Sequence, residues 1–260
     1  MMRGLHTPVR AIRRRVFKEV AQLGFKADAD TLLADMEAIP YAIVNEDSEK
    51  YRESVYRARA IVRERLRLAM GLSLRPENKP VHLTAGVEAS NISEKYYEPP
   101  LMQVIPSACE SCEENKYEVS NICKGCLAHP CQEVCPKDAI SMVNGRSYID
   151  QEKCIKCGKC KSVCPYDAIA KKERPCQKAC GVNAIKSDKM GRAYIDNEKC
   201  VSCGMCMVSC PFGAISDKSQ IFQLARALSE GENVIAEIAP AFVGQFGDNI
   251  TPRNIKAALR

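Results

Sequence analysis

The sequence lacks the long apolar runs that would place it in a membrane. No stretch approaches the roughly 18 to 20 apolar residues that a membrane-spanning helix needs. The first residues, MMRGLHTPVRAIRRRVF, are basic but have neither an apolar centre nor a small-residue cleavage site, so they do not resemble a secretory signal. We therefore expect no membrane association and a cytoplasmic location.

Cysteine is absent from two long parts of the chain and dense in the part between them. All sixteen cysteines lie between Cys109 and Cys210. They form tight groups rather than scattered pairs, and a chain without a secretory signal stays in a reducing compartment, where disulfides are rare. The pattern therefore predicts metal ligation and not a disulfide framework.

The excess of positive charge does not indicate a nucleic-acid partner. The formal net charge is +6 at pH 7, and residues 1–26 alone hold seven basic residues against one acidic residue. A basic run of this kind is more often a solvated helix face than a binding site. The remainder of the chain is close to neutral, so we expect no nucleic-acid binding.

Residues 1–75 carry apolar residues at helical spacing and are predicted to form helices. A second helix is expected over Asp30–Ile39, ended by Pro40, and a third over about Ser48–Met70. In the first helix, which precedes these two, the apolar face is expected to consist of Val9, Ile12, Val16, Val20 and Leu23. This helix is expected to end at Gly24.

An internal repeat follows. The segment that starts at Cys135, CPKDAISMVNGRSYIDQEKCIKCGKCKSVCPYDAI, matches CGVNAIKSDKMGRAYIDNEKCVSCGMCMVSCPFGAI, which starts at Cys180. Each copy predicts two short strands joined near a glycine (Gly145 or Gly191), then a cysteine loop and a short helix.

The spacing C-x2-C-x2-C-x3-C-P occurs twice without a defect, at Cys154–Pro165 and Cys200–Pro211. In bacterial ferredoxins the first three thiolates of such a run bind one [4Fe–4S] cluster and the fourth binds the neighbouring one. A third run, Cys123–Pro136, has a two-residue insertion. Pairing it with the first complete run predicts a first cluster on Cys123, Cys126, Cys131 and Cys164, and a second on Cys135, Cys154, Cys157 and Cys160.

The second ferredoxin-like unit, which contains the run Cys200–Pro211, needs ligands from outside the repeat. Cys176 and Cys180 match the third and fourth cysteines of a run, but the segment AIAKKERP before them holds no cysteine. The unassigned C-x2-C pair at Cys109 can supply what is missing. This predicts a third cluster on Cys180, Cys200, Cys203 and Cys206, and a fourth on Cys109, Cys112, Cys176 and Cys210, so that four clusters use all sixteen cysteines.

Some alternatives stay open. Cys109 and Cys112 could instead form a structural zinc site with two neighbouring thiols, since C-x2-C spacing also suits zinc. Gly181 stands where proline usually follows the fourth cysteine, so the third and fourth clusters are less well supported than the first two. Imidazoles could also ligate metal, but the cysteine count needs none of His6, His82 and His129.

The last part of the chain changes pattern again. SQIFQLARALSEG predicts an amphipathic helix, ENVIAEIAP a buried strand, and TPRNIKAALR a helix with Thr251 as its N-cap. That helical pattern is still running at Arg260, so we expect a truncated sequence. The chain is thus predicted to be α+β, with a helical region (1–75), an irregular connection (76–108), tandem ferredoxin-like units (109–218) and the opening strand and helix of a further α/β domain (219–260).

With the repeat and IAEIAPAFVGQFG in view, the chain resembles the N-terminal part of monomeric iron-only ([FeFe]) hydrogenases of the clostridial kind. The stretch Ser219–Arg260 is similar to the opening of their hydrogen-cluster domain, and NKPVHLTAGVEASNISEKYYEPPLMQVIPSAC to their N-terminal extension. The resemblance implies electron transfer between a soluble carrier such as ferredoxin and a catalytic domain in the same chain. That family binds its diiron centre with four further cysteines, and none follows Cys210, so we expect no catalytic residue here.

Two other functions remain open on the sequence alone. The chain could be a free-standing polyferredoxin that carries electrons for another redox enzyme. It could also be an iron–sulfur sensor or a structural protein whose clusters brace the fold.

Overall fold

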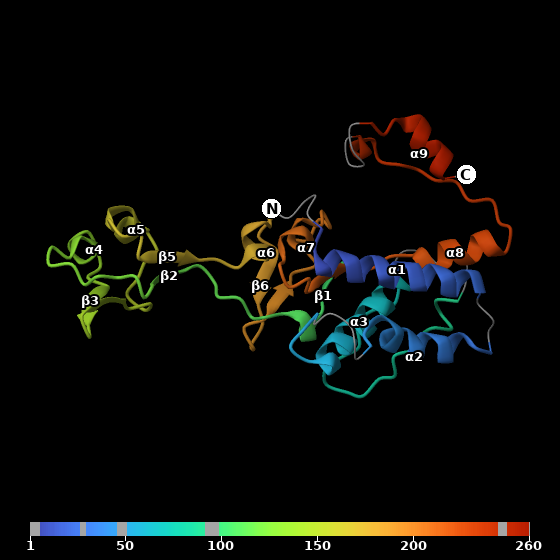
Figure 1. Ribbon diagram of the computed structural model, residues 1–260, viewed down its shortest axis with the longest axis horizontal. Helices are drawn as coiled ribbons and strands as arrows, with labels where there is room; N and C mark the ends of the chain where they lie inside the picture. The colour runs from blue at the N-terminus through green and yellow to red at the C-terminus, as the bar shows by residue number, and fades with distance from the viewer. Residues whose placement is uncertain (1–5, 27–29, 46–50, 92–98, 244–248, 260) are drawn as a thin grey trace.

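The computed structural model describes residues 6–26, 30–45, 51–91, 99–243 and 249–259. Figure 1 shows an elongated molecule with a small lobe at one end, a second lobe beside it and a helical region at the other end. Within the described ranges, no helix is long and apolar enough to cross a membrane.

Four helices from both ends of the chain share one core. They are α1 (Pro8–Lys26), α2 (Leu32–Ile43), α3 (Val55–Ala69) and α8 (Ile221–Ser229). Each contributes a side chain with no solvent exposure to this core: Val20, Met36, Val62 and Phe222. The helix predicted near residue 220 therefore packs with the N-terminal helices.

Two expected helix ends are wrong for reasons that depend on packing. Gly24 lies inside α1 where α8 crosses it, and a Cβ there would come within 2.7 Å of the Ala225 Cβ, so glycine permits the close approach. Pro40 lies inside α2, which continues to Ile43. A proline near the end of a helix forfeits only one N–H bond, and the Pro40 carbonyl still accepts from the Val44 N–H at 3.1 Å.

The third helix begins later than expected. The α3 helix starts at Val55, with Ser54 as its N-cap, because the Ser54 side chain accepts from the Arg57 N–H. The expected start at Ser48 lies outside the described residues.

The outer lobe (residues 119–169) is joined to the rest of the molecule through a neck (residues 113–118 and 170–174). Two antiparallel strands run from the neck into the lobe, with Tyr117 opposite Lys171 and Val119 opposite Ile169. A β-hairpin and two one-turn helices complete the lobe. The elements are β2 (Lys116–Val119), α4 (Pro130–Glu133), β3 (Ile140–Val143), β4 (Arg146–Ile149), α5 (Lys159–Val163) and β5 (Ile169–Lys172).

The inner lobe (residues 100–112 and 175–217) repeats this plan, with one antiparallel strand pair, one β-hairpin and two short helices. Its first strand, before the repeat, pairs antiparallel with its last, placing Met102 opposite Asp217. The elements are β1 (Met102–Val104), the 3-10 turn η1 (Pro106–Ala108), α6 (Pro175–Lys178), β6 (Ile185–Ser187), β7 (Ala193–Ile195), α7 (Met205–Ser209) and β8 (Ile215–Asp217).

The predicted hairpins of the repeat are confirmed. Ile140 of β3 pairs with Ile149 of β4, and Ile185 of β6 pairs with Ile195 of β7. The first hairpin turns through Asn144 and Gly145, whose φ angles of 49° and 73° are the left-handed values that a tight hairpin turn requires. The mixed helix and strand content is that of an α+β protein.

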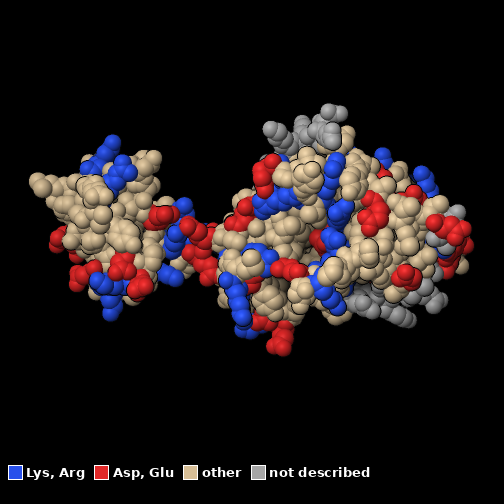
Figure 2. All heavy atoms as spheres, turned by 90° about the horizontal axis from the view of Figure 1, so that it is seen from below, with Lys and Arg blue, Asp and Glu red and all other residues tan. Residues whose placement is uncertain are grey.

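The neck is held by charged side chains. Figure 2 shows acidic and basic groups gathered at the narrow join between the lobes. Lys116 pairs with Glu113 at 2.6 Å, Lys172 with Glu118 at 3.2 Å, and Glu173 with both Lys171 and Lys178. These groups are largely solvated, so the neck is a polar connection rather than a packed interface.

The C-terminal segment leaves the helical region and carries the 3-10 turn η2 (Pro240–Phe242) and α9 (Pro252–Ala258) (Figure 1). The predicted helix is confirmed, with a capping box between Thr251 and Asn254. The predicted buried strand is wrong: residues 232–239 are exposed and have no strand partner among the described residues, with Ile235 94% exposed. A strand needs a neighbouring strand to satisfy its backbone groups, and the described residues offer none.

Candidate metal centres

The structure brings the predicted cysteine sets together. The sixteen cysteines, all described, are free thiols. Three separate cavities are each lined by the four cysteines of one predicted set, without a cysteine of any other set. These are Cys123, Cys126, Cys131 and Cys164; Cys135, Cys154, Cys157 and Cys160; and Cys109, Cys112, Cys176 and Cys210.

The third set is also assembled, around the buried Cys206 of α7. Burial, together with the neighbouring thiols of Cys200, Cys203 and Cys180, raises the pKa of the Cys206 thiol to about 11. Those three are the other members of the predicted third set. In the part of the chain that the structure describes, no group of three or more Cys, His, Asp or Glu is arranged to hold a single metal ion.

The four C-x2-C loops share one backbone conformation. The second residue after the leading cysteine has a positive φ in all four: Ser111 at 46°, Gly125 at 56°, Lys156 at 60° and Ser202 at 55°. The loop at Cys109, which lies outside the repeat, therefore has the same turn as the loops inside it. At Gly125 the need for glycine is steric, since a Cβ would lie 2.1 Å from the Gly145 carbonyl oxygen.

A second device follows each fourth cysteine. Four residues further on, an alanine N–H donates to the cysteine sulfur, at 3.2–3.4 Å; the pairs are Ala139 to Cys135, Ala168 to Cys164, Ala184 to Cys180 and Ala214 to Cys210. Hydrogen bonds to the cysteine sulfurs tune the reduction potentials of iron–sulfur clusters. Cys180 makes this turn although Gly181 replaces the proline, because Asn183 adopts the left-handed conformation that the turn requires (φ 51°).

Burial keeps several thiols protonated in the absence of a metal. Burial, with a smaller contribution from Cys210 and an opposing one from Arg174, raises the pKa of Cys176 to about 12. Burial also raises the pKa of Cys112 and of Cys160. Four buried thiols that face one cavity resist ionisation without a metal. They are suited to binding a metal group, which replaces their protons and coordinates the sulfurs.

Arg174 is a buried residue beside the fourth set whose contacts the sequence did not reveal. Its side chain is 2% exposed and lies where the missing C-x2-C pair of the second unit would precede Cys176. It donates twice to the Cys112 carbonyl, at 2.8 and 3.0 Å, and once each to the carbonyls of Gly191 and Lys186. Arg174 thus attaches the out-of-repeat loop to the inner lobe and places a positive charge beside the fourth set.

Arginines of the helical region support the same set from the other side. Arg52 donates to the carbonyls of Ala108 (3.0 Å) and Phe212 (2.8 Å), and Arg65 of α3 donates to the Gly213 carbonyl. Burial lowers the pKa of Arg65. The loops around Cys109 and Cys210 are therefore fixed to the helical region, whereas the first two sets lie in the outer lobe.

The three histidines do not line the three cysteine cavities. His6 and His82 are exposed, in the helical region and in the connection that follows it. His129 precedes α4 with a left-handed backbone (φ 42°) in the predicted insertion, but the cavity at Cys131 has no imidazole in its wall.

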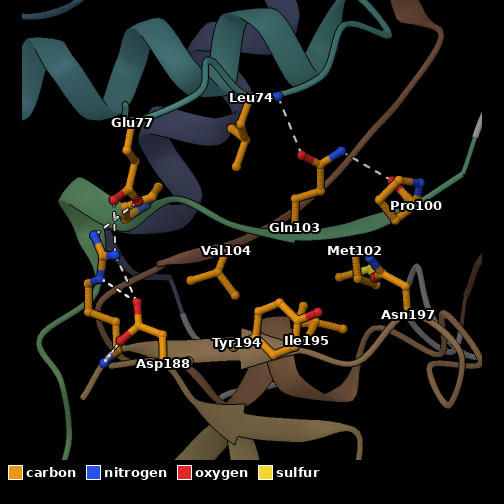
Figure 3. A pocket seen from close by; sticks show the side chains of 13 residues that line it. Leu74, Glu77, Pro100, Met102, Gln103, Val104, Asp188, Tyr194, Ile195 and Asn197 are labelled. Carbon is orange, nitrogen blue, oxygen red and sulfur yellow. Dashed lines mark hydrogen bonds and ion pairs between the residues drawn. The ribbon is translucent and has the colours of Figure 1, made fainter. Parts of the chain in front are cut away.

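A cavity without cysteines lies between β1 and β7. It has a volume of about 230 Å³ and is partly apolar, with Met102, Val104 and Ile195 in its wall. Figure 3 shows Glu77 and Asp188 at one end and Gln103 near Pro100 at the other. Arg192 pairs with Glu77 at 3.0 Å and with Asp188 at 2.8 Å, so these charges satisfy one another and tie the connecting segment to the inner lobe.

Comparison with known proteins assigns a chemistry to the cysteine sets. Residues 123–174 match the family profile of the LdpA Fe-S cluster-binding domain, and residues 193–216 match that of the 4Fe-4S binding domain. An uncharacterized ferredoxin of Methanocaldococcus jannaschii is 33% identical over 99 residues, 31% of this chain and 63% of its own. The electron transport protein HydN of Escherichia coli K12 is 37% identical over 71 residues, 27% of this chain and 41% of its own.

Together these matches define an iron–sulfur electron carrier with multiple [4Fe–4S] clusters in ferredoxin-like domains. The seven-iron ferredoxin of Hydrogenibacillus schlegelii is 43% identical over 53 residues, which are 20% of this chain and 68% of its own. The chain therefore belongs, through its cysteine-rich lobes, to the ferredoxin family. It spans less than two thirds of the length of the Methanocaldococcus and HydN relatives.

Proposed function

We propose that the chain holds four [4Fe–4S] clusters and carries electrons between the two lobes, in the cytoplasm. The observation that carries this proposal is the grouping of sixteen cysteines into four sets of four, with none left over. Each set combines the two cysteines of a C-x2-C loop, a third cysteine that follows them in the chain, and a fourth from the partner run. Two sets lie in the outer lobe and two in the inner lobe.

The protein's own residues determine how such a relay would work. A [4Fe–4S] cluster, when bound, takes up and gives back one electron. The alanine N–H groups donate to the sulfur of the last cysteine of each run (Cys135, Cys164, Cys180 and Cys210). Arg174 adds a positive charge at the fourth set. A positive charge favours the reduced, more negative state. We therefore propose that the fourth set, with Arg174 beside it, would give a bound cluster a higher reduction potential than the other three sets would, and that electrons would leave the chain from this site.

The destination that we propose is the catalytic domain of an iron-only hydrogenase that would follow in the same polypeptide. The support is the similarity of Ser219–Arg260 to the opening of that domain, together with the position of α8 and α9 beyond the inner lobe. A free-standing polyferredoxin is the second candidate, favoured by the ferredoxin relatives. The sensor hypothesis has no residue of the described structure in its favour.

Two measurements separate these functions. The gene beyond codon 260 should encode the cysteine motifs of a hydrogen-cluster domain if the first proposal holds, and a stop codon at that point would favour the polyferredoxin. The purified chain should be reduced by dithionite or reduced ferredoxin and pass its electrons to an added acceptor without producing hydrogen. Hydrogen production by this chain, even after the diiron cofactor is supplied, would contradict the assignment.

A further inference from the structure

Two cluster loops of the repeat share one backbone but differ in charge. Lys156 and its counterpart Ser202 have φ angles of 60° and 55°, and the glycines two residues later, Gly158 and Gly204, have 80° and 73°. Three lysines of the outer loop, Lys156, Lys159 and Lys161, stand where the inner loop has Ser202, Met205 and Met207. The outer loop therefore carries three more positive charges on the same framework.

The lysine loop, residues 153–163, is also the more open of the two. Lys156, Lys159 and Lys161 are exposed, whereas Ser202, Met205 and Met207 are half-buried. Within the described ranges none of the three lysines has an ion-pair partner, while Lys153 pairs weakly with Asp150 at 3.9 Å. Their ammonium groups are thus available to a molecule that approaches from solvent.

The centre of the lysine loop is apolar and contains a predicted ligand of the second cluster. Ile155 is 56% exposed and Val163 is 36% exposed. Cys157 between them is an exposed thiol that belongs to the cavity of the second set. The α5 helix, which includes Lys159, Lys161 and Val163, lies in the outer lobe, and this lobe is at the end of the molecule away from the helical region (Figure 1). A protein could dock here without meeting the rest of the chain.

We propose that the lysine loop is the docking surface for an acidic one-electron carrier protein. This inference rests on the proposed relay function. The reduced carrier gives one electron to the oxidised cluster held by Cys135, Cys154, Cys157 and Cys160; the carrier is oxidised, the cluster is reduced, and no bond forms or breaks. The lysines attract the carrier's carboxylates, and Ile155 and Val163 contact an apolar surface next to its own cofactor.

Charge selects this partner over others. Unpaired cations around an apolar centre steer an anionic protein to the loop and raise its association rate, an effect that falls with ionic strength. A carrier with a basic surface would be repelled. Each lobe holds two cysteine sets, so the three lysines are the charge difference between the two loops, and the inner loop, which lacks them, would attract an acidic carrier less.

The test compares association with the cluster-loaded wild-type chain and three variants, using a small acidic 2[4Fe–4S] ferredoxin as the probe. K156S/K159M/K161M gives the outer loop the residues of the inner one, and K156E/K159E/K161E reverses its charge. K79Q/K189Q/K199Q removes three exposed lysines elsewhere and is the matched control. The readouts are the second-order rate of cluster reduction against ionic strength and carbodiimide cross-links between lysines and carrier carboxylates, mapped by mass spectrometry.

We expect the wild-type rate to fall with salt, and charge reversal to lower it roughly tenfold at low salt and flatten its salt dependence. Cross-links should be located at Lys156, Lys159 and Lys161. The reduction rate of the control variant should stay within about twofold of the wild-type rate. A small cationic cytochrome should react faster with the charge-reversed variant than with wild type. Equal rates in all variants, or cross-links at lysines outside the lysine loop, would overturn the docking proposal. Photoreduced deazaflavin, a small reductant that needs no docking surface, distinguishes failure of the docking proposal from failure of the relay proposal. Clusters that it cannot reduce would refute the relay.

Discussion

The helical region and the outer lobe differ in what fills their interiors. Among the described residues, the helical core contains seventeen buried side chains and no cysteine, while the core of the outer lobe contains six, two of which are cysteines. Burial of aliphatic side chains can stabilise the first region on its own. The second has too little apolar surface for that, so its stability must come from thiolate ligation. The inner lobe combines both, because Ile61 and Leu68 of α3 pack against Ile105 and Ala214 near Cys210.

Removal of iron should have the largest effect and should separate the two regions. Anaerobic chelation is expected to unfold the outer lobe and leave α1 and α3 folded, because only the lobe depends on metal for its core. Hydrogen exchange measured peptide by peptide would show loss of protection in residues 119–169 and retention in the helices. Protection of the outer lobe in iron-free protein would refute this division.

The next effect tests the ligand sets. C109S/C112S should lose one cluster, and the iron content should fall by about a quarter, since those thiols belong to the fourth set alone. The EPR signals of the outer lobe should be unchanged, because its eight ligands lie elsewhere. The matched variant C123S/C126S should instead lose an outer-lobe cluster. Loss of the same cluster in both variants would show that the pairing is wrong.

Removing Arg174 should affect the inner lobe only. In R174M the carbonyls of Cys112, Gly191 and Lys186 lose their donor, which should cost up to about 3 kcal/mol of inner-lobe stability and lower the reduction potential of the fourth cluster. R174K keeps the charge but has fewer donors, so its potential should stay nearer to wild type. EPR-monitored redox titration measures the shift. An unchanged potential in R174M would show that Arg174 has no electrostatic role.

The smallest expected effect lies in the helical region. G24A places a Cβ 2.7 Å from the Ala225 Cβ and 2.8 Å from the Phe222 carbonyl oxygen, so α1 and α8 must separate. We expect a loss of about 1–3 kcal/mol in the free energy of unfolding of this region, with iron content unchanged. Denaturation followed by circular dichroism, with iron analysis alongside, tests both. A parallel loss of iron would mean that the two regions are not independent.

The parts of the fold that the sequence predicts are those set by local chemistry. The two hairpins follow from the glycines near their turns, Gly145 and Gly191, and the predicted ligand sets follow from cysteine spacing and from the count of unassigned cysteines. What it misses depends on distant partners. Gly24 lies inside α1 because α8 returns to pack against it. Pro40 is a local exception, tolerated because it lies in the last turn of α2. Arg174 acquires its role from the Cys112 carbonyl, 62 residues away in sequence.

The central claim is that sixteen cysteines form four cluster sites, and metal content tests it most directly. Protein purified anaerobically, or reconstituted with iron and sulfide, should contain about sixteen iron and sixteen acid-labile sulfide per chain and no zinc. Mass-spectrometric metal analysis with a sulfide assay gives both numbers. About twelve iron with one zinc would contradict the account and place a structural zinc ion on Cys109 and Cys112.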